Sequence, residues 1–168
     1  MEDRYLFKAK KKNWQELPKD EQWVTGTIMY IENKCMMLIE DEDNLLRVHY
    51  LANEMWSADI YAIEVDESTI CRCTGLKDKN GKLIWESDII KDLFSDVCAQ
   101  IKYGSYQSCF DSTKTEHVGF YVDWSGKYTK RYRKDLGYWI NMVDAEVVGN
   151  AFDNPELCWE RNNNGKNY

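Results

Sequence analysis

The sequence predicts an all-β protein, mainly antiparallel with minor helix, and three observations support this fold class. Short runs of apolar, β-branched and aromatic residues recur along the chain and are separated by turn-forming residues. Aromatic residues make up 14% of the chain, including 7 Trp and 11 Tyr, and such residues are enriched in strands. Only 2 Pro interrupt the 168 residues. Short strands punctuated by turns are typical of all-β domains.

The first part of the chain is typical of an antiparallel meander. The polar stretch from Lys8 to Gln22 predicts a loop, and Glu32-Asn33-Lys34 predicts a hairpin turn. Residues Leu51–Tyr61 are ambiguous and could hold one or two helical turns. Strands are expected at Tyr5–Lys8, Trp23–Ile31, Cys35–Ile39, Leu45–Tyr50, Ala62–Val65 and Thr69–Cys73.

The second part of the chain carries the strongest turn signal, Asn80-Gly81. This dipeptide predicts a type I′ turn, because both central residues of that turn need a positive φ, which Asn and Gly adopt easily. Asn154-Pro155-Glu156 predicts the start of a short helix, since Asn can cap and Pro suits the first helical position. Strands are expected at Leu83–Trp85, Asp88–Leu93, Val97–Tyr103, His117–Trp124, Leu136–Val143 and Glu146–Phe152.

The composition is that of a soluble globular protein, with 43% apolar and 30% charged residues. The length suits one domain or two small ones. The formal net charge of −7 makes the whole chain a poor match for the phosphate backbone of nucleic acid. The acidic balance favours solubility, and any nucleic-acid role would need a local basic patch.

The cysteines predict a protein that stays in a reducing compartment. No segment resembles a signal peptide, and no apolar run is long enough for a membrane span, so we expect free thiols and no membrane partner. Cys71-x-Cys73 invites a zinc interpretation, but structural zinc usually needs two close pairs of ligands. In a strand these two side chains share one face, which favours packing. We therefore predict no metal and no cofactor.

Two runs of residues carry a resemblance to a known family. The first is Thr74–Lys91, TGLKDKNGKLIWESDIIK, and the second is Glu146–Leu157, EVVGNAFDNPEL. In this order they resemble the signature of the YopX-like family of bacteriophage and prophage proteins. Gly, Asn and Pro in turns are usually selected for the backbone conformation they adopt, so we expect structural roles for the matching residues. Those residues include Thr74, Gly75, Asp78, Asn80, Gly81, Glu86, Asp88, Gly149, Asn150, Asn154 and Pro155.

The resemblance implies a mainly β fold whose C-terminal part is similar to an SH3-like β-barrel. It implies no activity, because none is established for the family. We expect an N-terminal β subdomain at 1–72, the barrel subdomain at 73–160 and a disordered tail at 161–168. The chain departs from the signature at Ser87, where the family has Gly. If that position needs a positive φ, Ser costs about 1 kcal/mol there.

The segment 127–134 is the strongest candidate for binding chemistry. Cations interleaved with aromatic rings suit the phosphates and bases of single-stranded nucleic acid. The alternative is a solvated hairpin whose charges balance acidic neighbours. The lysines at 8, 10, 11 and 12 would add to this patch if they lie close to it. The segment consists of Lys127, Tyr128, Thr129, Lys130, Arg131, Tyr132, Arg133 and Lys134.

No catalytic residue is predicted. The sequence has no G-x-S-x-G nucleophile motif and no phosphate-binding loop of the GxxxxGK type. The acidic run Glu40–Asp43 favours a solvated turn over a Mg²⁺ site, and Asp88 and Asp92 are too far apart on one strand to share an ion. An unrecognised enzyme would depend on Asp88 and His117 with nearby carboxylates.

These observations together predict a phage- or prophage-derived protein of the bacterial cytoplasm, not secreted. We expect a non-enzymatic binding or interaction module whose partner is an unidentified protein, with association between copies of the chain as a further possibility. Two alternatives stay open. One is a single-stranded nucleic-acid-binding module that uses residues 127–134, although the net charge disfavours it. The other is an unrecognised enzyme.

Overall fold

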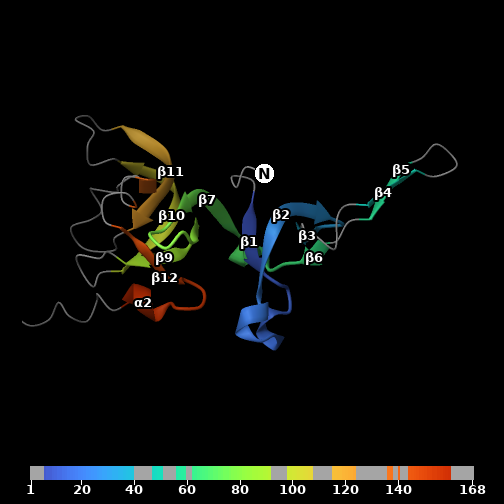
Figure 1. Ribbon diagram of the computed structural model, residues 1–168, viewed down its shortest axis with the longest axis horizontal. Helices are drawn as coiled ribbons and strands as arrows, with labels where there is room; N and C mark the ends of the chain where they lie inside the picture. Colours follow the sequence, from blue (N-terminus) through green and yellow to red (C-terminus); the bar gives the residue numbers. More distant parts are fainter. Residues whose placement is uncertain are drawn as a thin grey trace, which may run out of the picture. The chain divides into compact units, whose positions relative to one another are not determined.

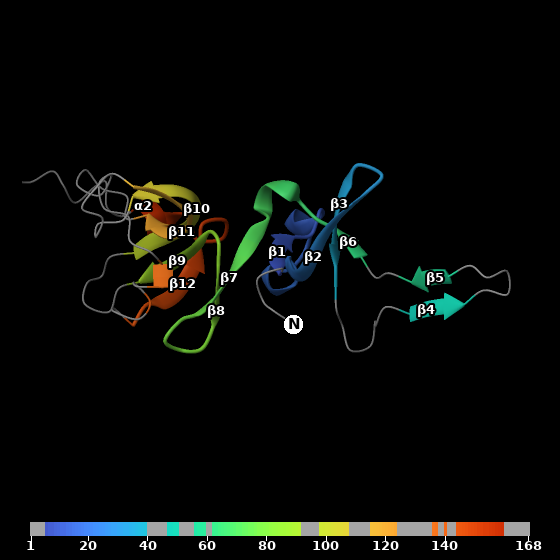
Figure 2. The ribbon, with the colours of Figure 1, turned by 90° about the horizontal axis from the view of Figure 1, so that it is seen from above.

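The chain forms two compact units, an N-terminal unit of residues Met1–Arg72 and a C-terminal unit of residues Cys73–Tyr168 (Figures 1 and 2). The computed structural model describes residues 6–39, 47–50, 56–59, 62–91, 98–107, 115–123, 136–137, 140 and 144–159. The expected tail at 161–168 lies outside these residues. The described strands are mainly antiparallel, which confirms the predicted all-β class.

The N-terminal unit is built on strands β6-β3-β2-β1-β7, which belong to a six-stranded antiparallel sheet whose order continues to β8 (Leu83–Trp85) (Figure 2). Three short 3-10 turns lie between these strands, and two further strands, β4 and β5, pair with each other. The strands are β1 (Phe7–Lys10), β2 (Trp23–Ile31), β3 (Lys34–Leu38), β4 (Arg47–Tyr50), β5 (Trp56–Asp59), β6 (Ala62–Glu64) and the start of β7 (Cys71–Lys77). The 3-10 turns are η2 (Trp14–Glu16), η3 (Lys19–Glu21) and η4 (Glu67–Thr69).

The turn between β2 and β3 is a tight hairpin. Its two central residues, Glu32 and Asn33, have φ values of 49° and 65°, the left-handed geometry of a type I′ turn. Ile31 pairs with Lys34 directly across the turn. The hairpin predicted at this position is therefore confirmed, as is the strand Trp23–Ile31.

The core of the N-terminal unit follows from the alternation of side chains along the strands. On β3, Cys35 and Met37 point to the same face and are buried. They cluster with the buried residues Ala9, Val24 and Val65. Within the ambiguous segment Leu51–Tyr61, residues Trp56–Asp59 are not helical but form β5, which pairs with β4.

The C-terminal unit contains a four-stranded antiparallel sheet with the order β11-β10-β9-β12, together with the β7–β8 hairpin (Figure 1). Its core consists of the buried residues Ile84, Ile90, Ala99, Ile101, Val122, Leu136 and Ala145. The remaining elements are β8 (Leu83–Trp85), β9 (Asp88–Lys91), β10 (Cys98–Gln107), β11 (Glu116–Asp123), β12 (Glu146–Asn150) and the short helix α2 (Glu156–Trp159).

The turn between β7 and β8 differs from the predicted type I′ turn. Gly81 has a φ of 79°, but Asn80 is not among the residues with positive φ. The backbone N–H of Gly81 donates to the carbonyl of Asp78 at 2.9 Å, so Lys79 and Asn80 are the central residues of the turn. A turn followed by a left-handed Gly makes a longer hairpin loop. The dipeptide predicted the hairpin, but the register of the turn is shifted by one residue.

Two further expectations for the C-terminal unit are corrected. Leu136, Gly137 and Ile140 are helical, whereas Leu136–Val143 was expected to be extended. Leu136 and Ile140 are four residues apart, so one helix face places both against the core. The SH3-like barrel is not closed by the described strands, because β11 and β12 lie at opposite ends of the four-stranded sheet and do not pair with each other.

Candidate functional site

The two runs that carry the family resemblance meet in the C-terminal unit. Strand β9 from the first run pairs antiparallel with β12 from the second, with Val147 opposite Ile90 and Asn150 opposite Asp88. A bulge between Val147 and Gly149 interrupts the register. We call residues Thr74–Lys91 and Glu146–Leu157 together the motif junction. Residues far apart in the sequence are thus placed on neighbouring strands.

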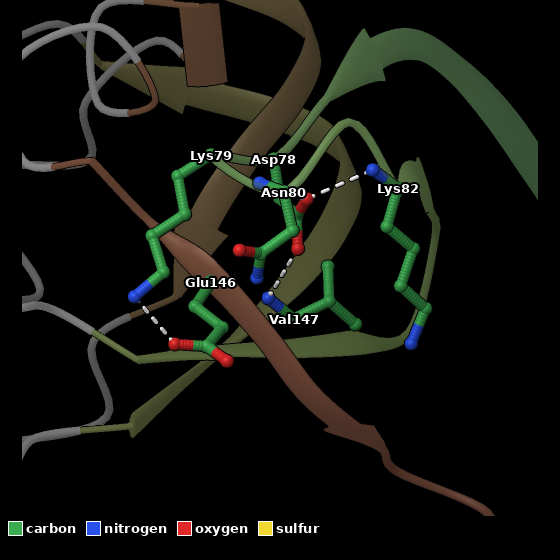
Figure 3. Close-up of polar contacts among 6 residues, drawn as sticks. All are labelled: Asp78, Lys79, Asn80, Lys82, Glu146 and Val147. Atoms are coloured by element: carbon green, nitrogen blue, oxygen red, sulfur yellow. Dashed lines mark hydrogen bonds and ion pairs between the residues drawn. The ribbon is translucent and has the colours of Figure 1, made fainter.

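Asp78 connects the two halves of the motif junction (Figure 3). Its Oδ1 accepts hydrogen bonds from the backbone N–H groups of Asn80 and Lys82, both at 2.9 Å. Its Oδ2 accepts one from the backbone N–H of Val147 on β12, at 3.1 Å. The neighbouring Lys79 forms an ion pair with Glu146 at 2.6 Å. One buried carboxylate therefore shapes the β7–β8 turn and attaches it to β12.

The environment of Asp78 also controls its ionisation. Burial alone would raise the pKa of this carboxyl, because the charged form loses contact with water. The backbone N–H groups of Val147, Lys82 and Asn80 outweigh that effect and hold the pKa below its usual range. Asp78 is therefore a fixed negative charge at neutral pH, with both oxygens engaged by the backbone.

A second set of side-chain hydrogen bonds stabilises the end of β12 and the residues that follow it. Asn150 accepts hydrogen bonds through its Oδ1 from the backbone N–H groups of Phe152 and Asp153, both at 3.0 Å. The Oδ1 of Asn154 accepts one from the backbone N–H of Asn150 at 3.4 Å. A Cβ at Gly149 would lie 2.6 Å from that same oxygen. Gly149 is thus needed for Asn154 to approach the strand, and Pro155 follows directly before α2.

The first run also contains a strained turn between β8 and β9. Ser87 has a φ of 67°, in the left-handed region that favours Gly. Its backbone N–H donates to Ile101 and its carbonyl accepts from Ala151, both at 2.9 Å. The Oδ2 of Asp88 accepts a hydrogen bond from the backbone N–H of Trp85 at 2.9 Å. The positive φ that the resemblance suggested for this position is therefore present, with Ser in place of Gly.

Among the remaining motif residues, Thr74 and Gly75 shape β7. The hydroxyl of Thr74 donates to the carbonyl of Ile84 on β8 at 2.7 Å, and Gly75 has a φ of 73°. Glu86 lies directly before Ser87 in the turn between β8 and β9. Thr74, Asp78, Asp88 and Asn150 thus make hydrogen bonds from their side chains to the backbone of the same unit.

The two residues proposed for an unrecognised enzyme lie at different places in the sheet. Asp88 is buried beside Ile89, which pairs with Gln100, whereas His117 pairs with Tyr106 and stacks on its ring at 5.5 Å. Six positions along β10 separate these two rows, a span of about 20 Å. Asp92 and Asp96 lie outside the described residues. The carboxylate of Asp88 and the imidazole of His117 are therefore not brought together.

Metal-ligating residues show a similar separation. Within the described ranges, no three His, Cys, Asp or Glu side chains gather as they would around a metal ion. Cys71 and Cys73 are buried on one side of β7, and the Sγ of Cys71 donates to the carbonyl of Thr69 at 3.4 Å. In the part of the chain that the structure describes, no helix has the length and apolar character of a membrane span.

The basic segment 127–134 lies outside the described residues, so its predicted role stays a prediction. The lysines that were expected to add to it can be placed in part. Lys10 is only 2% exposed, and its Nζ donates to Gln22 at 3.0 Å and lies 3.8 Å from the centre of the Trp14 ring. Lys10 is therefore buried beneath Trp14 and does not contribute to a surface basic patch. Lys8 lies above the Trp23 ring at 5.3 Å.

An apolar surface on the β10–β11 hairpin was not found from the sequence. Tyr103 and Phe120 are direct cross-strand partners whose rings contact edge to face at 5.1 Å. Val118 lies two residues before Phe120 and so shares its face of β11. Val118 is 69% exposed and Tyr103 is 43% exposed. Phe120 is partly buried and packs against the core of the unit. We call these three residues the β10–β11 patch. Alternation along His117–Trp124 was the available signal, but the partner strand and its register were unknown.

A second exposed feature lies at the end of the β2–β3 hairpin. Tyr30 is 62% exposed and Ile31 is 42% exposed, next to the turn at Glu32 and Asn33. The hydroxyl of Tyr30 donates to the Oε1 of Glu67 at 2.6 Å, and this hydrogen bond is the main reason that the pKa of Tyr30 rises to about 12. We call Tyr30, Ile31, Glu32 and Asn33 the β2–β3 tip.

Comparison with known proteins identifies one family. The family described as YopX protein matches residues 9–158, which include both halves of the motif junction and most of the N-terminal unit. No curated protein matches the chain.

Proposed function

Because the chain belongs to the YopX protein family, we propose that it is a non-enzymatic binding module, derived from a phage or prophage, that recognises another protein. The side chains of Asp78, Asp88 and Asn150 accept backbone hydrogen bonds, which supports a structural role for them and recognition through other surfaces. The observation that carries the proposal is the β10–β11 patch. Its exposed side chains, Tyr103 and Val118, lie beside the partly buried Phe120, and aromatic and aliphatic groups on one face can anchor a protein interface.

The position of the patch suggests how a partner would bind. Strand β11 is the end strand of the four-stranded sheet in the described part of the chain. An extended segment of the partner can add to such a strand through backbone hydrogen bonds, while its side chains cover those that project from the strand. Val118 and Phe120 would then be covered from one face, and burial of Val118 would remove the most exposed side chain of the patch from water.

A capture experiment with a matched control tests this proposal. The full chain serves as bait in a lysate of the bacterial host, alongside Val118→Lys and Val148→Lys. Val148 is an exposed valine on β12, outside the patch. We expect a specific host or phage protein to be captured by the wild type and by Val148→Lys, and to be lost with Val118→Lys. Capture that is equal for all three baits, or no capture at all, would contradict the proposal.

Single-stranded nucleic-acid binding is a second candidate function, and the distribution of charge favours it. The N-terminal unit has nine Lys and Arg against fifteen Asp and Glu, a net charge of −6. The C-terminal unit has thirteen against fourteen, a net charge of −1. Most of the net negative charge therefore belongs to the N-terminal unit, whereas residues 127–134 belong to the nearly neutral C-terminal unit.

Fluorescence anisotropy with a single-stranded oligonucleotide distinguishes this candidate. Binding through residues 127–134 would weaken steeply with added salt and would be lost in the triple variant Lys130→Ala, Arg131→Ala and Arg133→Ala. The control is a triple variant of three lysines in the acidic unit, Lys11→Ala, Lys12→Ala and Lys19→Ala. Absent binding at low salt, or equal loss in both triple variants, would exclude this function.

The proposed location is the cytoplasm of the bacterial host. Support comes from the cysteines that the structure describes, Cys35, Cys71, Cys73 and Cys98, which are present as thiols. Burial raises the pKa of the Cys35 thiol, although a hydrogen bond with Tyr30 opposes this effect. A buried thiol with a raised pKa reacts slowly, as suits a packing role in a reducing compartment.

A further inference from the structure

The β2–β3 tip has the properties of a preorganised contact. The type I′ turn fixes the backbone at Glu32 and Asn33, and the hydrogen bond from Tyr30 to Glu67 fixes the phenol ring. An ordered aromatic side chain loses less conformational freedom on binding than a mobile one. Tyr30 and Ile31 are consecutive residues of β2 and project to opposite faces of the hairpin, and both keep large exposed surfaces. The tip thus presents two apolar side chains on a rigid hairpin end.

The charges around the β2–β3 tip restrict its partner. Glu32 and Glu67 are exposed, and Glu64 lies opposite Met36 on the neighbouring strand. The nearest described cation on the hairpin is Lys34, which forms an ion pair with Glu64 at 3.4 Å. The whole N-terminal unit has an excess of six negative charges. A partner for this tip must therefore bring cations to the carboxylates as well as a surface for Tyr30 and Ile31.

The chain itself contains a segment of that chemistry. Residues 127–134 hold five basic residues and two tyrosines, more basic residues than any other eight-residue window of the sequence. Arginine can bind a carboxylate through two hydrogen bonds and can also stack on an aromatic ring, which lysine does less well. Arg131 and Arg133 could thus engage Glu32 or Glu67 and the ring of Tyr30 at once.

We propose that the β2–β3 tip of one copy binds residues 127–134 of a second copy. The two surfaces differ from each other, so the contact is heterologous and each copy has one of each surface to offer. Such contacts produce rings when the rotation between copies closes and open chains when it does not. The protein would therefore assemble beyond the dimer, in a reaction that salt weakens because opposite charges drive it.

Sedimentation velocity on the full chain tests this assembly. We expect the average mass of the wild type to rise with concentration at about 50 mM salt and to fall to that of the monomer at about 500 mM salt. A tip variant, Tyr30→Ser with Ile31→Ser, should be monomeric, as should the triple variant of Lys130, Arg131 and Arg133 to Ala. The control variant, Val148→Ser with Phe152→Ser, removes exposed apolar side chains elsewhere and should assemble like the wild type.

Mixing the two deficient variants separates docking from misfolding. The tip variant retains an intact basic segment, and the triple variant retains an intact tip. An equimolar mixture should therefore form a dimer of one copy of each and stop there, because no further matching surface remains. A wild type that is monomeric up to about 100 μM at low salt, a tip variant that assembles normally, or a mixture that stays monomeric would each overturn the proposal.

Discussion

Each unit uses an aspartate to hold a turn, but the donors differ. In the N-terminal unit, Asp66 accepts hydrogen bonds from the hydroxyl and backbone N–H of Ser68 and from the indole of Trp14. In the C-terminal unit, Asp78 accepts its three from backbone N–H groups. A backbone donor is present whatever the side chain at that position, whereas Ser68 and Trp14 must keep their identity. The contacts of Asp66 therefore depend on the identity of neighbouring side chains, whereas those of Asp78 depend on the course of the backbone.

The largest effect is expected in the N-terminal unit, at Gly26 on β2. A Cβ at this position would lie 1.9 Å from the backbone oxygen of Leu38, so Gly26→Ala forces β2 and β3 apart. We expect a loss of about 3 kcal/mol or more in the free energy of unfolding, measured with urea. In the control, Gly75→Ala, no atom lies within 4 Å of the new Cβ, and only the positive φ opposes it. A loss of about 1 kcal/mol is expected there, and equal losses would contradict the clash.

The two aspartates should differ in their contribution to stability. Asp78→Ala leaves buried backbone N–H groups without their acceptor, and we expect it to lower the free energy of unfolding by about 2–3 kcal/mol. Asp66→Ala removes a more local set of contacts, so about 1 kcal/mol is expected. Urea unfolding of both variants at neutral pH measures the difference. If Asp66→Ala costs as much as Asp78→Ala, backbone donors are not what distinguishes the two units.

Acid should remove the contribution of Asp78. Its folded pKa lies below the ordinary value, so the stabilisation is complete above the unfolded pKa of about 3.9 and is lost as pH falls through the folded pKa. The stability difference between the wild type and Asp78→Asn should therefore be constant from neutral pH to about pH 5 and should shrink below about pH 4. Unfolding by urea across this range provides the measurement, and a pH-independent difference would show that the charge has no part in it.

The smallest effect is a gain in stability at Ser87. Its φ of 67° is unfavourable for a residue with a Cβ, and Ser87→Gly should stabilise the protein by about 1 kcal/mol. Ser87→Ala keeps the Cβ and is the matched control, which should show no such gain. Thermal unfolding of the two variants distinguishes relief of strain from loss of the hydroxyl. A gain in both variants would assign the effect to the hydroxyl instead.

Local signals in the sequence predicted the elements that depend on local physics. The strand Trp23–Ile31 and the turn at Glu32 and Asn33 follow from residue types and short-range geometry, whereas the positive φ at Ser87 was expected only from the Gly of the family signature. The motif residues were identified by resemblance, but the bond from Asp78 to Val147 joins positions 69 residues apart and had no local signal. Tertiary packing decided the helical conformation at Leu136, whose apolar neighbourhood also suits a strand.

The candidate surfaces were harder to predict because exposure depends on the arrangement of strands. On β11, Val118 and Phe120 are two residues apart, as expected for side chains on one face of a strand, and Tyr103 lies on the partner strand β10. The sequence does not indicate that the exposed residues Tyr103 and Val118 lie beyond the buried core of the unit. Lys10 presents the opposite case. It was grouped with surface lysines by its position in a basic run, yet the rings of Trp14 and Trp23 cover it. Its burial depends on indole rings that its immediate sequence neighbours do not supply.

Strand β7 has a consequence for how such proteins can be inherited. The boundary between the two units falls inside this strand, whose Cys71 pairs with Lys8 and whose Cys73 pairs with Trp85. Domains that are exchanged between genes are usually joined by linkers that few hydrogen bonds cross. A recombination point at residue 72 would instead divide a strand that pairs with β1 before this residue and with β8 after it. The two units are therefore expected to be inherited as a pair, as the single family match over residues 9–158 indicates.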